Sequence, residues 1–210
     1  SLFTFVPPAL GQAAALAGPT GQTFIASRRP DLAGHNTTLA TDASGDATAI
    51  WEASNAGTPE LYASQFSAVL GGWGPRFLLA TLGRLGVSAE RVAMNGRGGA
   101  LVAWSESEDL IRTRIYLPAQ GWLPQLAPIS AAAGGLYDVA MRPNQAFVLY
   151  SDAAFNLVIA QLESYIWSAP IRLVSNFGGA IGLPRLSVHL DAPLGCTVVV
   201  WDQPAGIYFI

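Results

Sequence analysis

Residues 37–51 read TTLATDASGDATAIW and residues 90–104 read ERVAMNGRGGALVAW, and the two stretches align without a gap. Residues 136–150 (LYDVAMRPNQAFVLY) align with them, and residues 183–201 (LPRLSVHLDAPLGCTVVVW) align with a few extra residues. Each stretch consists of a strand-like segment, a polar turn and a more apolar strand-like segment. This is the pattern of a β-hairpin, and its recurrence along the chain predicts a repeat architecture.

The repeat is about 50 residues long, because the aromatic residues that close the stretches lie 53, 46 and 51 positions apart: Trp51, Trp104, Tyr150 and Trp201. In the second unit we expect strands at 91–94, 100–104, 110–117 and near 125–129. The third of these alternates apolar and polar residues, as a strand does. Four short strands in each unit of this length predict an all-β fold, a β-propeller of about four four-stranded blades.

The ends of the chain suggest how such a ring could close. The fourth unit stops after a third-strand segment, GIYFI (206–210), whereas TFIAS (23–27) is a spare fourth strand near the N-terminus. We expect this N-terminal strand to complete the last blade, which would remove an exposed sheet edge. A larger propeller, of about six to eight blades, or assembly with another copy are the alternatives. Residues 1–22 are predicted to be an N-terminal extension or edge segment, and 23–210 the propeller domain.

Composition excludes several classes of function. The 210 residues include 11 basic and 14 acidic residues, all the basic ones are Arg, and the net charge is -3. Nucleic acid is not expected as a partner, because phosphate binding needs a basic patch. The single Cys196 excludes an intrachain disulfide and a cysteine-rich zinc site. No catalytic, phosphate-binding or metal motif is present, so we expect no cofactor, no metal and no catalytic residue. No apolar run is long enough to predict a membrane-spanning helix.

The first unit resembles a repeat of exported bacterial β-propeller proteins, of the type D-x-x-G-x-A-x-A-V-W. Here the repeat reads DASGDATAIW (42–51), then LYASQF (61–66) and GGWG (71–74). The resemblance covers roughly residues 23–210 and implies the propeller fold and a place outside the cell or at its surface. It implies no single function, because such repeats occur in proteins of many functions.

The loops between second and third strands, and between a fourth strand and the next first strand, share one face of a propeller. They hold about half of the charged residues of a charge-poor chain, so we expect this face to bind a ligand. The alternative is that charge simply collects in loops. The candidate residues are Glu52, Glu106, Glu108, Asp152, Asp202, Arg28, Arg84 and Arg185.

Three tryptophans lie in turn-like contexts that follow the third strand of each unit: Trp73, Trp122 and Trp167. Their rings could stack on sugars, as aromatic platforms do in lectins. The alternative is that they pack against the edge of their own blade.

Together these features favour a non-enzymatic, extracellular binding module for a glycan or a protein. A structural protein that self-associates in a cell-surface or virion-like assembly is the first alternative. The second is a carboxylate-dependent glycoside hydrolase, with Glu106 or Glu108 facing Asp152 or Glu52. The polar loops differ between the units, which argues against four identical sugar sites.

Overall fold

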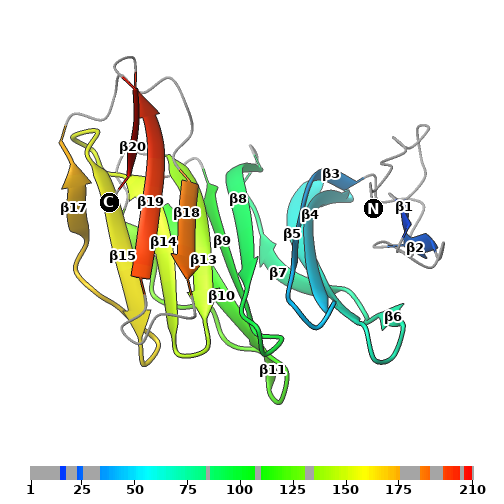
Figure 1. Ribbon diagram of the computed structural model, residues 1–210. Coiled ribbons are helices and arrows are strands. Elements are labelled where there is room, and N and C mark those ends of the chain that lie inside the picture. Colours follow the sequence, from blue (N-terminus) through cyan, green and yellow to red (C-terminus); the bar gives the residue numbers. More distant parts are fainter. Residues whose placement is uncertain are drawn as a thin grey trace. The chain divides into compact units, whose positions relative to one another are not determined.

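The computed structural model describes residues 15–17, 23–25, 34–83, 86–106, 110–130, 135–175, 185–189, 196–203 and 206–209 (Figure 1). The chain divides into two compact units, Ser1–Gly86 and Val87–Ile210, and each is described by itself. All the regular secondary structure in the described ranges is β-strand, which confirms the all-β prediction. A helix able to cross a membrane does not occur among these residues. The predicted boundary between residues 22 and 23 lies next to residues that the structure does not describe.

The first unit contains one five-stranded antiparallel sheet, called sheet 1. In it, β3 pairs with β4, β4 with β5, and both β6 and β7 pair with β5. The bounds are β3 (Gly34–Thr41), β4 (Ala47–Asn55), β5 (Thr58–Ser67), β6 (Gly72–Trp73) and β7 (Phe77–Thr81). A separate pair joins β1 (Ala15–Ala17) to β2 (Thr23–Ile25). Of the spare strand expected at 23–27, residues 23–25 form β2 with β1 as partner, and residues 26–27 lie outside the described residues. Its pairing with the fourth repeat stays a prediction.

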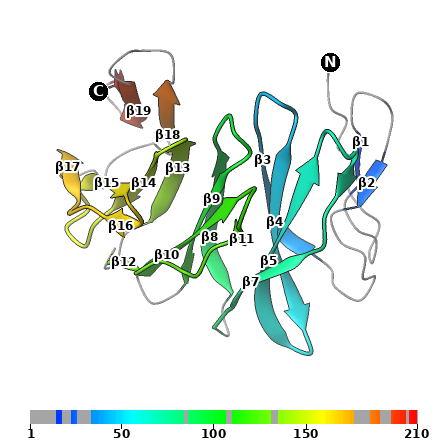
Figure 2. The same cartoon turned by 90° about the horizontal axis from the view of Figure 1, so that it is seen from below.

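The second unit repeats this sheet twice and adds a smaller one (Figure 1). Sheet 2 contains β8 (Val87–Met94), β9 (Ala100–Glu106), β10 (Leu110–Leu117), β11 (Gly121–Trp122) and β12 (Ile129–Ser130). Sheet 3 contains β13 (Leu136–Arg142), β14 (Gln145–Ser151), β15 (Leu157–Glu163), β16 (Ile166–Trp167) and β17 (Ile171–Val174). Sheet 4 contains β18 (Arg185–His189), β19 (Cys196–Gln203) and β20 (Gly206–Phe209). Within this unit β13 lies beside β18 (Figure 2).

The fourth strand of each complete repeat is split into two short pieces that pair with the same third strand. Prolines stand in each gap, at Pro75, Pro124, Pro128 and Pro170. Proline has no N–H to donate to a sheet ladder, so the pairing stops there and resumes beyond it. Each complete repeat therefore contains five strands, where the sequence predicted four.

The first hairpin turns of sheets 1 and 2 share one side-chain geometry. The Oδ1 of Asp42 accepts the amides of the second and fourth following residues at 2.8 and 3.1 Å. The Oδ1 of Asn95 does the same at 2.9 and 3.0 Å. Asp and Asn favour turns because their side chains hydrogen-bond the backbone in this way. The structure thus confirms that residues 42–46 form a hairpin turn.

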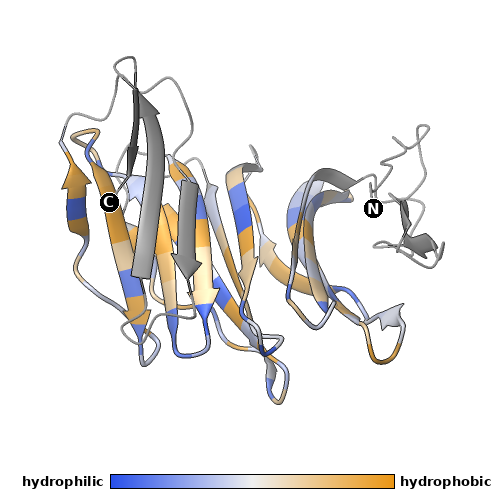
Figure 3. Cartoon of the chain, viewed as in Figure 1, coloured by the Kyte–Doolittle hydropathy of each residue, from blue (hydrophilic) through white to orange (hydrophobic). Residues whose placement is uncertain are grey.

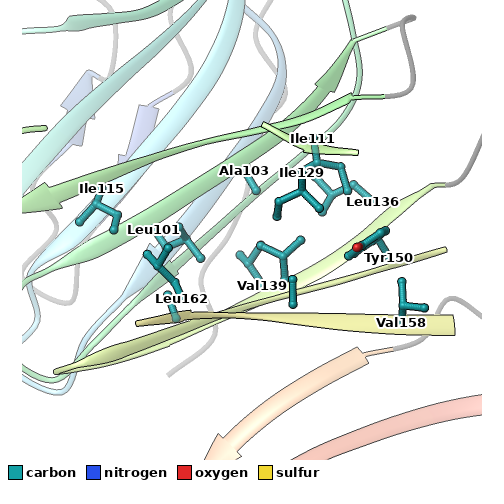
Figure 4. Close-up of a cluster of buried hydrophobic side chains, with 13 residues drawn as sticks. Leu101, Ala103, Ile111, Ile115, Ile129, Leu136, Val139, Tyr150, Val158 and Leu162 are labelled. Carbon is teal, nitrogen blue, oxygen red and sulfur yellow. The ribbon is translucent and has the colours of Figure 1, made fainter. Parts of the chain in front are cut away.

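Sheets 2 and 3 pack face to face on an apolar core (Figure 4). Leu101, Ile111 and Ile115 of sheet 2 meet Val148 and Leu162 of sheet 3, and all five side chains are buried. The apolar runs of β14 and β15 show as hydrophobic bands in Figure 3. On the other face of sheet 3, a second cluster contains Ala140, Phe147, Leu149, Leu157 and Ile159. Sheet 3 is therefore apolar on both faces, as the near-continuous apolar run of β14 indicates.

Candidate functional site

A pocket of about 250 Å³ opens where the ends of sheets 2 and 3 meet, inside the second unit. One wall is the end of β10, and the other is formed by the β13–β14 turn and the β15–β16 turn. Its volume is slightly below the range of about 300–1,000 Å³ that is typical of small-molecule sites. The lining residues are Ile115, Leu117, Met141, Arg142, Pro143, Asn144, Gln145, Ala146, Leu162, Ser164 and Tyr165.

The pocket has an apolar floor and a rim that contains most of its polar groups. The floor is lined by aliphatic side chains, among them Ile115, Met141 and Leu162. Asn144, Ser164 and the half-exposed Tyr165 belong to the turns of the rim. A concave apolar surface with a few polar groups at its edge is the usual construction of a small-ligand site.

The β15–β16 turn brings Tyr165 to this rim. Glu163 pairs with Ile166, so the turn has two central residues, Ser164 and Tyr165. Their φ angles are 51° and 63°, and a two-residue hairpin with both central φ values positive is a type I′ turn. Asn-Gly is the favoured sequence for such a turn, because side chains with a Cβ are strained in the left-handed region.

Of the residues expected on the loop face, Glu52 and Asp152 have described side chains. Glu52 lies inside β4, because β4 and β5 stay paired up to a two-residue turn at residues 56–57. Its side chain is half-buried. Its carboxylate lies against Gly86, where an added Cβ would be 2.5 Å from Oε1. Glu52 is thus a strand residue and not a loop residue.

Asp152 organises its own turn. Its Oδ1 accepts the amides of Ala154 and Asn156, each at 2.9 Å, and its Oδ2 accepts the Asn156 side chain at 2.9 Å. The hydrogen bond from the Asn156 side chain and that from the Asn156 amide are the main causes that lower the pKa of Asp152. A general acid in glycoside hydrolysis needs a raised pKa, so this carboxyl group is unsuited to that role.

The remaining loop-face candidates cannot be assembled into a site. Arg28, Arg84 and Glu108 lie outside the described residues. The backbone places Glu106 at the end of β9, Arg185 at the start of β18 and Asp202 in β19.

Each of the three tryptophans packs against neighbouring side chains. Trp73 packs on Phe66 with ring centroids 5.5 Å apart, and Trp122 packs on Tyr116 at 5.4 Å. Trp167 packs against the core of sheets 2 and 3 and donates its indole N–H to Thr113 Oγ1 at 3.1 Å. All three are half-buried, so these contacts favour the packing role over an open sugar platform.

Sheet 1 holds a second group of polar and aromatic side chains. The Tyr62 hydroxyl donates to Glu60, its ring stacks on Trp51 at 5.9 Å, and the Arg76 guanidinium lies 4.7 Å above that ring. Trp51 Nε1 and Arg76 Nη1 are buried without a hydrogen-bond partner. The pocket described above is lined by none of these residues, so we do not assign this cluster as the site.

Sequence reasoning predicted the β13–β14 turn as part of a hairpin, but it did not single out that turn or Tyr165 as part of a site. Tyr165 lies in QLESYIWSAP (161–170), which contains no glycine or asparagine to predict a type I′ turn. The one available signal was the neighbouring Trp167, which was predicted to lie in a turn. The pocket also forms at the strand ends opposite the loop face on which the candidate residues were expected.

No protein-family model matches the sequence, and no curated protein matches it. Solved structures do match the fold. A variant of the Aleuria aurantia lectin in complex with α-methyl-L-fucoside has a TM-score of 0.56 at 13% identity, over 83% of this chain and 60% of the lectin. AofleA from Arthrobotrys oligospora has a TM-score of 0.57 at 12% identity, over 82% of this chain and 52% of AofleA. The SapL1 lectin in complex with α-methyl fucoside has a TM-score of 0.56 at 15% identity, over 96% of this chain and 74% of the lectin.

The fold is similar to that of β-propeller lectins. The described sheets supply three complete repeats and a three-stranded fourth, in agreement with the predicted repeat. The chain spans 60% and 52% of the lengths of the first two proteins. At these identities the likeness establishes the fold and not the ligand.

Proposed function

We propose that this chain is a non-enzymatic carbohydrate-binding module that holds a sugar in the pocket between sheets 2 and 3. The observation that carries the proposal is an open pocket with an apolar floor and an aromatic, polar rim in a fold similar to that of lectins. A sugar ring has an apolar C–H face and polar edges, and such a pocket offers complementary surfaces to both.

The proposal includes a preference for a 6-deoxy sugar such as fucose. Its methyl group would lie on the aliphatic floor formed by Ile115, Met141 and Leu162, and its hydroxyl groups would meet the turns of the rim. Burial of one methyl group contributes about 0.8 kcal/mol. Two of the similar structures are lectins in complex with a methyl fucoside, which supports this choice of probe.

Two further parts of the proposal concern the whole molecule. The fourth, three-stranded repeat would be completed by an N-terminal strand, so that the chain forms a four-bladed ring. The module would act outside the cell, in keeping with its resemblance to exported bacterial repeat proteins and with its sparse charge of 12% Asp, Glu, Lys and Arg.

A glycan array followed by calorimetric titration tests the function. We expect wild-type protein to bind at least one class of terminal sugar, with methyl α-L-fucoside as the first soluble probe. Asn144→Trp places a large ring at the rim of the pocket and should weaken binding at least tenfold. Asn55→Trp is the control, because Asn55 is also an exposed asparagine at a two-residue hairpin turn: Asn144 lies in the β13–β14 turn, and Asn55 borders the β4–β5 turn of sheet 1.

Three results would decide against this assignment. Wild-type protein that binds no glycan on the array contradicts the function. Equal binding by wild type and Asn144→Trp contradicts the pocket, and equal losses in both tryptophan variants show a general effect of the substitution.

Self-association is a second candidate, favoured by one specific feature. Val69 and Leu70, in the turn between β5 and β6, are 93% and 85% exposed. The turn is ordered, because the Ala68 amide donates to Asp46 Oδ1 at 2.7 Å and the Gly71 amide to the Ser67 carbonyl at 2.9 Å. Exposed apolar side chains on an ordered turn suit contact with another protein. Light scattering that gives a 22 kDa monomer at all concentrations would contradict this candidate.

A further inference from the structure

We propose that Tyr165 contacts the ligand directly and that the β15–β16 turn keeps it in an unfavourable backbone conformation for that purpose. The proposal rests on the carbohydrate-binding function proposed above. It adds the residue that contributes most to affinity, and it states that the residue is retained at the expense of stability.

The first argument is the conformation itself. Ser164 and Tyr165 have φ values of 51° and 63°, so two consecutive residues with side chains lie in the left-handed region. This region is unfavourable for residues other than glycine, and least so for Asn and Asp. Such strain persists only where the surrounding structure imposes it, and it concentrates at functional sites.

The second argument comes from turns elsewhere in the chain. The β4–β5 hairpin is also a two-residue turn with both φ values positive, and its second position is Gly57. Two more left-handed glycines lie where the third strand of a sheet leads into the next: Gly71 in the turn before β6, and Gly121 as the first residue of β11. Glycine is thus common at such positions, and the described exceptions are Ala56, Phe155, Ser164 and Tyr165. Phe155 is also an exposed aromatic, but Ser164 and Tyr165 are the two of these four that line the pocket.

The third argument is that packing does not account for the tyrosine. Tyr165 is 52% exposed, so about half of its surface remains in contact with water. The aromatic residue of this hairpin that packs against the core is the half-buried Trp167, two residues later, and its indole N–H donates to Thr113. Tyr165 instead lines the rim of the pocket. Tyr is an efficient contact residue, because it offers a large surface with few rotatable bonds.

The base of the hairpin is fixed, so the turn cannot relax by sliding. Leu162 pairs with Trp167 and Glu163 pairs with Ile166 in the sheet ladder. Glu163 Oε1 also accepts hydrogen bonds from Gln145 at 3.0 Å and from Gln161 at 2.5 Å. These contacts favour the two-residue turn, and they fix the backbone on both sides of Ser164 and Tyr165.

The test compares glycine substitutions in the two turns of this kind. Ala56→Gly, in the β4–β5 turn, replaces a residue with a φ of 50° that does not line the pocket. It should raise the midpoint of thermal unfolding by roughly 2–4 °C and leave the affinity for methyl α-L-fucoside within twofold of wild type. Tyr165→Gly should not lower the unfolding midpoint, yet it should weaken binding at least tenfold. Tyr165→Phe keeps the ring and should keep affinity within threefold.

The outcomes separate this inference from the proposed function. If wild type binds no sugar on the array or in the titration, the function itself is contradicted. If wild type binds and Tyr165→Gly binds equally well, the function survives and the role of Tyr165 is wrong. If Tyr165→Gly unfolds at a clearly lower temperature, the tyrosine is a packing residue, and the claim that it is retained at the expense of stability fails.

Discussion

The β4–β5 hairpin of sheet 1 and the β15–β16 hairpin of sheet 3 have the same kind of turn and different residues in it. Both turns have two residues with positive φ, but one contains Ala56 and Gly57 and the other contains Ser164 and Tyr165. Backbone geometry therefore does not determine the residue. The comparison teaches that one repeat relieves strain at the second turn position with glycine, whereas the other has a side chain at both positions, beside the pocket.

The two repeats also differ in whether the indole N–H of an equivalent tryptophan has a hydrogen-bond acceptor. Trp73 and Trp167 both pair with the third strand of their sheet. Trp167 donates to Thr113 Oγ1, whereas Trp73 Nε1 is buried without a partner. Sheet 3 is thus firmly attached to sheet 2 immediately beside its strained turn. That attachment supplies the surrounding structure that a strained turn requires.

The largest expected effect comes from a substitution in the apolar core between sheets 2 and 3. Leu101→Ala deletes a side chain that is fully buried between sheets 2 and 3 and should lower the free energy of unfolding by about 2–5 kcal/mol. Leu78→Ala in sheet 1 is the control, because Leu78 is 42% exposed and should change stability much less. Denaturant titration measures both, and equal losses would show that the apolar core does not distinguish these positions.

The second effect compares the tryptophans. Trp167→Phe leaves the buried Thr113 hydroxyl without its indole donor, while Trp73→Phe removes an N–H that has no partner. Trp167→Phe should therefore cost about 1–2 kcal/mol more than Trp73→Phe, the value of an unsatisfied buried polar group. Thermal unfolding of the pair tests this, and a larger loss for Trp73→Phe would refute the comparison.

The third effect reverses the turn substitution in sheet 1. Gly57 has a φ of 84°, and no atom lies within 4 Å of a Cβ added there. Gly57→Ala therefore introduces backbone strain without a clash and should cost about 1 kcal/mol. If Gly57→Ala is neutral, the left-handed turn carries little strain in this protein, and the interpretation of Ser164 and Tyr165 weakens with it.

The smallest expected effect is a pH dependence of stability that comes from Asp152, at the end of sheet 3 opposite the pocket. The pKa of Asp152 is lowered by its hydrogen bonds to Asn156, so the ionised group stabilises the folded state above its unfolded pKa. This contribution is lost as pH falls from about 4 through the lower, folded pKa. Asp152→Asn retains an Oδ1 acceptor, as Asn95 does in its own turn, and should show a smaller loss of stability between pH 5 and pH 2.5. An unchanged acid profile would contradict the role of the Asp152 charge.

Much of the fold could be predicted because the repeat is visible in the sequence. The third strand of the second unit, residues 110–117, was predicted by its alternating side chains and forms β10 with the same bounds. The strand expected at 100–104 lies within β9 (Ala100–Glu106). The split of the fourth strands was not predicted, although the prolines that cause it are in the sequence.

The candidate site was harder to predict, for a physical reason. Glu52 was placed in a loop because NAGT (55–58) looks like part of a long connection, but the strands continue up to the two-residue turn. The pocket depends on side chains from β10 and from two turns of the next sheet. Such an arrangement follows from how two sheets pack, and no local pattern in the chain encodes it.

The central claim is tested most directly by following the backbone amide signals of the protein by NMR during titration with methyl α-L-fucoside. The account predicts saturable shifts concentrated in residues 142–146 and 162–165, the two turns that border the pocket. Saturable binding with shifts elsewhere, for example on the loop that contains Asp152, would contradict the assigned site. No saturable shift with this or any array-positive sugar would contradict the carbohydrate-binding function.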